Sequence, residues 1–204
     1  MNGNNFENNM IESSATKLPT EYGTFTVSAF GFPNSNNHLF LVYGTIEKND
    51  IPLVRVHSEC LTGEVFGSKK CDCKSQLIES INLIKAEGKG IIIYLRQEGR
   101  GIGLFNKIEA YKLQEEGFDT ITANMHLNLE VDSRDYYNAY LILHKKGVDK
   151  IRLITNNSEK IKQLEGYGIV ITAVVHTKMH MTGENQHYIN TKIAKLNHTF
   201  IIND

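Results

Sequence analysis

Between residues 76 and 175, segments whose apolar residues have the spacing of a helix alternate with short apolar segments of strand length. Residues 76–87 carry apolar side chains at the three- and four-residue intervals of an amphipathic helix, and a glycine follows them. Residues 90–95, Gly-Ile-Ile-Ile-Tyr-Leu, form an unbroken apolar run with the length of a buried strand. Further helices are expected at 102–116, 132–146 and 158–165, and further strands at 151–154 and 169–175. Alternating strands and helices predict an α/β sheet.

The segment before residue 60 is organised differently. Runs rich in β-forming residues at 24–31, 38–46 and 51–58 are separated by short polar turns, which is typical of antiparallel strands. The sequence therefore predicts an α/β (mixed α+β) fold, in which antiparallel N-terminal strands join a mixed sheet flanked by helices in a single compact domain. We expect a disordered arm at residues 1–17, the folded domain at 18–196 and a tail at 197–204, with 185–196 either helical or part of the tail.

Composition narrows the class of protein and its partners. Of the 204 residues, 41% are hydrophobic and 22% are charged, as in ordinary globular proteins, and the net charge of −1 gives no sign of a nucleic acid or a membrane as partner. The Asn-rich start lacks the basic and apolar regions of a signal peptide, and no apolar run has membrane-spanning length. These features and the unpaired thiols predict a cytoplasmic protein.

The three cysteines of the chain, Cys60, Cys71 and Cys73, lie within fourteen residues. Three thiolates can fill three corners of a zinc tetrahedron and leave the fourth to water, as a catalytic zinc requires. A disulfide would leave one cysteine over, and Cys71 and Cys73 are too close in sequence to pair comfortably. Two alternatives stay open, namely buried thiols without a function and redox-active thiols.

Polar residues precede the first cysteine. Arg55, His57 and Glu59 share one face if this segment is a strand, because side chains alternate. They would form a polar wall that leads to Cys60, although a solvated strand face is the simpler alternative. Alternation places Cys60 on the other side from Glu59, so we expect a bend or bulge there.

Three further segments contain residues suited to binding or catalysis. Residues 96–103 follow a buried strand and combine glycines with Arg96 and Arg100, which suits an anion site but also a plain turn. Residues 155–158 repeat that arrangement with Lys160 in the first helical turn, where simple N-capping explains the pattern equally well. Residues 130–137 place acidic side chains around Arg134, as the first turn of a helix also would.

Taken together, these segments resemble the GTP cyclohydrolase II family, whose members open the imidazole ring of guanine at the start of riboflavin synthesis. The resemblance runs from about residue 17 to about residue 195, with its segments in order and correctly separated. They are Arg55-Val-His-Ser-Glu-Cys-Leu-Thr-Gly63, Cys71-Asp-Cys73, Tyr94-Leu-Arg-Gln-Glu-Gly-Arg-Gly-Ile-Gly-Leu104, Ala110-Tyr-Lys-Leu-Gln114, Asp119-Thr120, Ala123-Asn124 and Leu153-Ile-Thr-Asn-Asn157.

The resemblance implies a role for each matching residue. Cys60, Cys71 and Cys73 would hold Zn²⁺, Asp132 would be the proton acceptor, and Arg134 would be the nucleophile that attacks the α-phosphorus. Tyr111 would lie beside the substrate, Mg²⁺ would accompany the triphosphate, and the protein would be a homodimer. The residues implied in GTP binding are Arg55, Val56, His57, Ser58, Glu59, Gln76, Glu98, Gly99, Arg100, Thr120, Thr155 and Lys160.

The implied reaction converts GTP to 2,5-diamino-6-(5-phosphoribosylamino)pyrimidin-4(3H)-one, formate and pyrophosphate, in a stand-alone form without the usual partner domain. A cationic Arg134 that only stabilises the leaving phosphate is the conservative alternative to a nucleophile. The sequence departs from the usual family pattern at Lys70, Lys74, Asn128, Ser158 and Asn197. These departures leave two alternatives, a divergent paralogue with another ring-opened product and a non-catalytic GTP-binding zinc protein. A zinc deaminase is disfavoured, because His57-Ser-Glu59 lacks the accompanying Pro-Cys-x-x-Cys.

Overall fold

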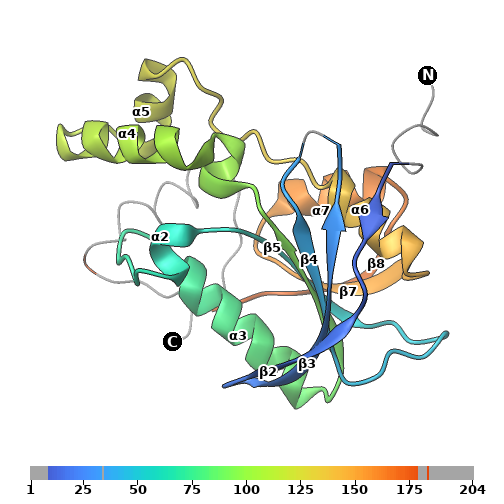
Figure 1. Ribbon diagram of the computed structural model, residues 1–204. Coiled ribbons are helices and arrows are strands. Elements are labelled where there is room, and N and C mark those ends of the chain that lie inside the picture. Colours follow the sequence, from blue (N-terminus) through green and yellow to red (C-terminus); the bar gives the residue numbers. More distant parts are fainter. Residues whose placement is uncertain (1–8, 34, 179–182, 184–204) are drawn as a thin grey trace.

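The computed structural model describes residues 9–33, 35–178 and 183, and its centre is an eight-stranded sheet (Figure 1). The strand order is β1-β3-β4-β6-β5-β7-β8, and β2 also pairs with β3. The strands are β1 (Ile11–Glu12), β2 (Thr16–Thr20), β3 (Gly23–Gly31), β4 (His38–Tyr43), β5 (Leu53–Ser58), β6 (Gly90–Leu95), β7 (Lys150–Ile154) and β8 (Val170–Val175). The helices are α2 (Leu61–Glu64), α3 (Cys73–Ala86), the 3-10 turn η1 (Glu98–Gly101), α4 (Gly103–Glu115), α5 (Thr120–His126), α6 (Tyr137–Lys145) and α7 (Ser158–Gly166).

The sheet combines two modes of pairing. β1 to β4 pair antiparallel with their neighbours, whereas β5 is parallel to both β6 and β7, and β7 is parallel to β8. β5 lies between β6, which it reaches through α3, and β7, which comes later in the chain. The carboxyl ends of parallel strands lie at one edge, and a strand with its successors on both sides marks the place where α/β sheets bind ligands. The predicted fold class is confirmed.

The two faces of the sheet bury separate apolar cores. Val54 and Val56 of β5 are fully buried in a core shared with α6 and α7, whereas Leu53 packs in a second core with α3. Burying each such side chain contributes about 1.5–3 kcal/mol. Because side chains alternate along a strand, Arg55 and His57 project toward the α3 side. Both are buried, so the strand carries polar groups inside the molecule next to the site.

Two strands lie within or overlap the segment expected to be a disordered arm. β1 and β2 pair with β3 in succession, and between them the backbone N–H of Ser13 donates to the carbonyl of Ala29 at 2.9 Å. The polar side chains stay largely exposed while the backbone supplies the pairing, so composition gave no sign of the strands. Residues 1–8, the helix-or-tail segment at 185–196 and the tail at 197–204 lie outside the described residues.

The helix expected at 132–146 starts later than predicted, at Tyr137. The Asp132 carboxylate accepts a hydrogen bond from the backbone N–H of Arg134 at 3.2 Å, and the Asp135 carboxylate accepts one from the N–H of Tyr137 at 2.8 Å. Such side chain-to-backbone bonds stabilise turns in competition with a helix. The acidic residues interpreted as a first helical turn therefore lie in an irregular segment before α6.

The helix α5 has no counterpart in the expected pattern, and neither has the four-residue α2. The N-cap of α5, Asp119, accepts hydrogen bonds from the backbone N–H groups of Ile121 at 2.8 Å and Thr122 at 2.9 Å, and the Thr122 hydroxyl accepts one from the Asp119 N–H at 3.0 Å. This reciprocal capping box starts a helix too short to show a clear apolar period. In the described part of the chain, no helix is long and apolar enough to cross a lipid bilayer.

Candidate metal centre and substrate cleft

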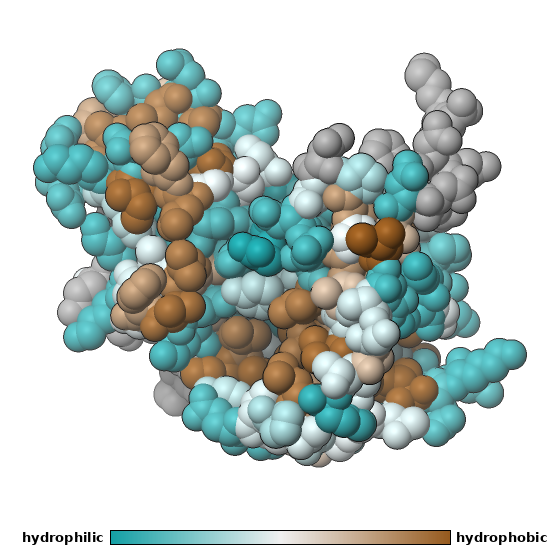
Figure 2. All heavy atoms as spheres, viewed as in Figure 1, coloured by the Kyte–Doolittle hydropathy of each residue, from teal (hydrophilic) through white to brown (hydrophobic). Residues whose placement is uncertain are grey.

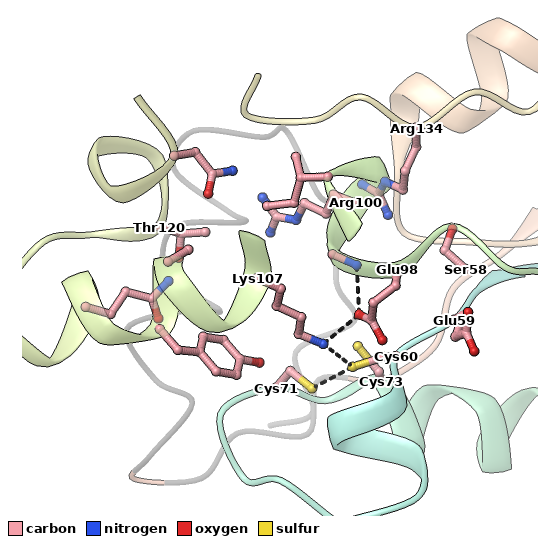
Figure 3. A pocket seen from close by; sticks show the side chains of 16 residues that line it. Ser58, Glu59, Cys60, Cys71, Cys73, Glu98, Arg100, Lys107, Thr120 and Arg134 are labelled. Atoms are coloured by element: carbon pink, nitrogen blue, oxygen red, sulfur yellow. Dashed lines mark hydrogen bonds and ion pairs between the residues drawn. The ribbon is translucent and has the colours of Figure 1, made fainter. Parts of the chain in front are cut away.

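Three cysteine sulfurs meet beyond the carboxyl end of β5 (Figure 3). Cys60 caps the start of α2, so the chain turns there, as the alternation of side chains predicted. Cys73 is the first residue of α3, and Cys71 lies in the turn before it. The three Sγ atoms lie within 4.8 Å of one another, and those of Cys60 and Cys71 are 3.5 Å apart.

The spacing of the sulfurs suits a tetrahedral metal ion. A zinc–sulfur bond of about 2.3 Å requires sulfurs about 3.8 Å apart. Gly63 makes the cluster possible, because a Cβ at that position would lie 2.9 Å from the Cys71 sulfur and 3.2 Å from the Cys60 sulfur. The group holds no fourth cysteine, histidine or carboxylate from the described residues. The donor set is therefore that of a three-thiolate site with a coordination position left for another ligand.

The thiols of the cluster differ in acidity. The pKa of Cys60 lies far below its usual range, because the Cys71 and Cys73 thiols donate hydrogen bonds to its sulfur and the Lys107 ammonium lies beside it. The same interaction raises the pKa of Cys71 to about 11 and that of Cys73 above its usual value. The Cys60 thiol is therefore the most acidic of the three, and a metal ion held by all three as thiolates would displace their remaining protons.

Lys107 of α4 contacts the cysteine cluster, whose sulfurs lie at the starts of α2 and α3. It is 9% exposed, and its Nζ lies 3.2 Å from the Cys60 sulfur and 2.7 Å from Oε1 of Glu98. Burial disfavours the ammonium, but the Glu98 carboxylate and the Cys60 thiolate outweigh this effect and raise the pKa of Lys107. Oε2 of Glu98 accepts a hydrogen bond from the Leu61 N–H at 2.6 Å, which joins η1 to the segment that follows Cys60.

A second largely buried carboxylate, that of Glu64, contacts the backbone of Cys60. It accepts hydrogen bonds from the Cys60 backbone N–H at 3.0 Å and from the Tyr94 hydroxyl at 2.6 Å, and it lies 2.8 Å from Nε2 of His57. Burial lowers the pKa of His57 despite Glu64, so the imidazole is neutral at pH 7. Its ring also stacks on Tyr94, with centroids 5.6 Å apart. These contacts fix the position of Cys60 through its backbone.

The cysteines open into a cleft whose empty volume, counted together with the open solvent at its mouth, is about 680 Å³. Its walls come from the end of β5, from the start of α3, and from η1, α4 and α5 (Figure 3). Tyr111 of α4 lines it as a neutral phenol, since burial raises its pKa to about 12. The lining residues are Ser58, Glu59, Cys60, Cys71, Cys73, Glu98, Gly99, Arg100, Ile102, Lys107, Ala110, Tyr111, Gln114, Thr120, Asn124 and Arg134.

A second cavity, of about 540 Å³, adjoins the cleft and is strongly cationic. The two share Ser58, Cys73, Arg100 and Arg134 in their walls. The remaining residues of this cavity are Arg55, His57, Gln76, Thr155, Asn156, Asn157 and Lys160. No carboxylate stands among these described lining residues, so the cavity suits an anionic group.

Two buried cations form the floor of the cationic cavity. Lys160 donates a hydrogen bond to the carbonyl of Val56, and burial together with Arg55 lowers its pKa. Arg55 donates to the carbonyl of Ile154 at 3.2 Å and to Oε1 of Gln76 at 3.0 Å, while its buried Nε makes no hydrogen bond to the described residues. Buried positive charges of this kind gain free energy when an anion binds beside them.

Arg134 and Asp132 form a two-pronged ion pair at the boundary between the two cavities. The Nε of Arg134 donates to Oδ1 of Asp132 at 2.8 Å, and its Nη2 donates to Oδ2. Burial opposes ionisation of Asp132, but the charge and hydrogen bonds of Arg134 outweigh it and lower the pKa of the carboxyl. Asp135, which follows Arg134 in the chain, accepts hydrogen bonds instead from the backbone N–H of Tyr137 and the hydroxyl of Tyr167.

The loop that carries Arg100 has an unusual backbone. Gly99 (φ 63°) and Arg100 (φ 59°) both adopt the left-handed conformation, which glycine tolerates and arginine rarely adopts. The carbonyl of Arg100 accepts a hydrogen bond from the Ser133 N–H at 3.0 Å, which ties the loop to the segment before α6. The predicted anion loop is thus a 3-10 turn rather than the plain start of a helix.

Most of the residues predicted for the site line one of the two cavities. Two of them do not. The side chain of Val56 lies in the core and only its carbonyl faces Lys160, and Asp132 reaches the cavities only through its ion pair with Arg134. The Thr155 hydroxyl accepts the Asn157 N–H at 3.1 Å, so it serves a turn as well as the cavity wall. Lys107 and Glu64 also lie at the site, although neither was predicted from the sequence. Lys107 lies one helical turn before Tyr111, and that spacing was the available signal.

Comparison with known proteins identifies the family. The family model described as GTP cyclohydrolase II matches residues 11–176. The chain belongs to the GTP cyclohydrolase II family. Within this family, the chain is 50% identical over 184 residues to the riboflavin biosynthesis proteins RibBA of Bacillus cereus and of Bacillus mycoides.

In both comparisons the match covers 89% of this chain and 46% of the relative, so the chain spans about half the length of the curated relatives it matches. Among solved structures, the crystal structure of RibBX, a two-domain 3,4-dihydroxy-2-butanone 4-phosphate synthase from A. baumannii, shows a distant similarity. The TM-score is 0.43 and the identity 18%, over 82% of this chain and 40% of that one.

Proposed function

We propose that this GTP cyclohydrolase II family member is a zinc-dependent enzyme that hydrolyses GTP to 2,5-diamino-6-(5-phosphoribosylamino)pyrimidin-4(3H)-one, formate and pyrophosphate, the first step of riboflavin biosynthesis. The observation that carries the proposal is the junction of two cavities, one lined by three cysteines and the other by four cations. Guanine would occupy the sulfur-lined cleft and the triphosphate the cationic cavity. Cys60, Cys71 and Cys73 would hold the zinc, which supplies activated water for ring opening.

The cations of the second cavity would bind the triphosphate together with Mg²⁺. Lys160 and Arg55 are buried there, so phosphate oxygens would meet them in a water-poor site where charge interactions are strong. Arg100 and Arg134 stand between the two cavities, near the place expected for the α-phosphate. Thr120 and Tyr111 line the cleft on the side expected for the base.

Arg134 would form a bond from a guanidinium nitrogen to the α-phosphorus, while the bond from that phosphorus to the bridging oxygen breaks and pyrophosphate leaves. The displaced proton would pass to Asp132, which accepts two hydrogen bonds from the Arg134 side chain. Water would later cleave the phosphorus–nitrogen bond. If no such bond forms, the same ion pair would hold a cationic Arg134 beside the leaving phosphate.

The direct test is to incubate the purified protein with GTP and Mg²⁺ and to identify the products by mass spectrometry. The proposal predicts the diaminopyrimidine product, formate and pyrophosphate in equal amounts. GTP that binds and is recovered intact would contradict it and would favour the non-catalytic GTP-binding alternative. A different ring-opened product would identify a divergent paralogue.

The protein is also proposed to be a homodimer and to act in the cytoplasm, as the family resemblance implies. The exposed apolar side chains of α4, Leu104, Phe105 and Ile108, are candidates for the dimer contact, and Figure 2 shows apolar side chains gathered over α4 and α5. Sedimentation velocity should give the mass of a dimer for the wild type and a smaller mass for Phe105→Glu. A monomeric wild type would contradict this part of the proposal.

A further inference from the structure

Lys107 occupies a position that a lysine rarely takes. Its ammonium is buried between the Cys60 sulfur and the Glu98 carboxylate, at 3.2 and 2.7 Å, and it points into the sulfur cluster rather than toward solvent (Figure 3). Burying an ammonium costs free energy unless charged partners compensate. The two partners on either side therefore hold the ammonium in place.

The carboxylate that holds Lys107 is itself tightly fixed. Glu98 accepts hydrogen bonds from the backbone N–H groups of Leu61 at 2.6 Å and Gly99 at 2.7 Å, in addition to that of Lys107. Leu61 follows Cys60 directly in the chain. Glu98 thus sets the ammonium at a defined distance from the sulfur, through contacts with the segment that carries it.

We propose that Lys107 is a positioning residue of the metal centre, whose ammonium donates a hydrogen bond to the Cys60 thiolate and offsets the excess negative charge of a three-thiolate site. This inference rests on the proposed function, in which the three cysteines hold zinc. Three thiolates and one divalent cation carry a net charge of −1, and the ammonium adds a positive charge 3.2 Å from one of the sulfurs. The Glu98 carboxylate contacts the ammonium at 2.7 Å, so the local sum is −1 and the effect of Lys107 is concentrated on the Cys60 sulfur.

The chemistry of the site explains why such a cation is useful. Three thiolates donate much electron density to a bound metal and weaken it as a Lewis acid, compared with neutral imidazole ligands. A hydrogen bond from a cation withdraws density from the sulfur that accepts it. Lys107, at 3.2 Å from the Cys60 sulfur, would therefore limit the loss of Lewis acidity.

Cobalt(II) provides a readout that does not depend on GTP turnover. In the cobalt-substituted protein, the sulfur-to-metal charge-transfer band reports the electron density on the ligating sulfurs. Lys107→Met keeps an unbranched side chain that is one atom shorter and removes the charge and the hydrogen-bond donor, so the band should move to lower energy. Lys107→Arg, which restores a cationic donor, should bring the band back toward its wild-type position.

The affinity for zinc measures the effect of Lys107 independently of the cobalt band. It can be determined by competition with a chromophoric chelator. Loss of a hydrogen bond to a metal ligand weakens metal binding by roughly 10- to 100-fold, and we expect a loss of this size for Lys107→Met. The matched control is Lys112→Met on the same helix, because Lys112 is exposed and, among the described residues, its ion pairs are with the exposed Glu115 and Glu116. Both the band and the affinity should be unchanged in the control.

The outcomes separate this inference from the proposed function. A folded Lys107→Met variant that binds zinc as tightly as the wild type, with an unshifted cobalt band, would overturn the role of Lys107 even if the wild type consumes GTP. A shifted band and weaker zinc binding would support the role of Lys107 even if GTP stays intact. A wild type that binds neither cobalt nor zinc would overturn both.

Discussion

At the scale of single residues, the buried charges around the cleft are held by specific partners. Glu64 is bonded to the Cys60 backbone and to Tyr94, Lys107 lies between a sulfur and a carboxylate, and Asp132 is paired with Arg134. Buried charges without such partners would destabilise the fold by several kcal/mol each. The pairing explains how one small domain keeps several cations and anions inside without losing its structure.

The residue with the most specific proposed role is Arg134. We expect Arg134→Ala to lower the rate of pyrophosphate release by about 10²- to 10³-fold or more, because a charge aimed at the reacting phosphate is lost. An assay coupled to pyrophosphatase measures this rate directly. Arg152→Ala is the control, since Arg152 pairs with Glu87 away from both cavities. If Arg134→Ala releases pyrophosphate at nearly the wild-type rate, a group other than Arg134 displaces the pyrophosphate.

Site residues of an unusual type or spacing could be predicted from the sequence. Residues that reach the site only through tertiary packing could not. Three cysteines in a short segment, followed by glycines and arginines after a buried strand, are visible in the chain itself. Lys107 lies in a helix where a lysine usually faces solvent, and its burial arises only because the sulfur cluster and Glu98 pack against α4. Glu64 lies four residues after Cys60, but no helix was expected there to bring the two together.

At the scale of elements, the site depends on how η1 meets the segment before α6. Gly101 (φ 90°) lies so close to this segment that a Cβ would be 2.8 Å from the backbone oxygen of Ser133. Gly101→Ala should therefore separate Arg100 from Arg134 and reduce turnover of GTP by at least about tenfold, since small displacements in a site are costly. Steady-state kinetics and the midpoint of urea unfolding should be measured together.

The matched control for this variant is Gly117→Ala. Gly117 has a similar backbone conformation (φ 101°), but nothing lies within 4 Å of the position of its Cβ. Gly117→Ala should lower the stability by about 1 kcal/mol, because alanine disfavours positive φ, and Gly101→Ala should lower it by more, because its Cβ would also clash with the Ser133 backbone. Only Gly101→Ala should also lose activity. Equal activities in the two variants would mean that turnover of GTP does not depend on the close approach of η1 to the segment before α6.

Elements with a regular apolar pattern were predicted well, and those set by side-chain hydrogen bonds were not. The strands at β5, β6 and β7 and the helices at α3 and α4 follow the expected ranges closely, because buried alternation and helical spacing determine them. The segment 132–136 carries good helix-starting residues, but its aspartates bond to the backbone and to Arg134 instead. α5 depends on the capping box at Asp119, which a periodicity search does not detect.

At the scale of the whole molecule, a buried histidine links three parts of the fold. His38 of β4 accepts a hydrogen bond from the Arg96 N–H at 3.1 Å and lies 3.0 Å from the side-chain amide of Asn138 in α6. Burial, together with the charge of Arg96, lowers its pKa to about 4. The unfolded chain therefore binds a proton more readily than the folded one, and the stability that neutral His38 contributes is lost as the pH falls below about 6.5.

This predicts a specific pH dependence of stability. The difference in free energy of unfolding between the wild type and His38→Gln should shrink by about 3 kcal/mol from pH 7 to pH 4, because glutamine does not titrate. Urea denaturation at a series of pH values gives this difference. A difference that stays constant over the range would show that His38 titrates alike in the folded and unfolded states.

The central claim is that three cysteines hold a metal ion on which the hydrolysis of GTP depends. The most direct measurement is to determine zinc content and formate release on the same preparations of the wild type and of Cys71→Ser. The account predicts one zinc per chain and formate release in the wild type, and loss of both in Cys71→Ser while the protein stays folded. A Cys71→Ser protein that keeps its zinc and releases formate at the wild-type rate would contradict it.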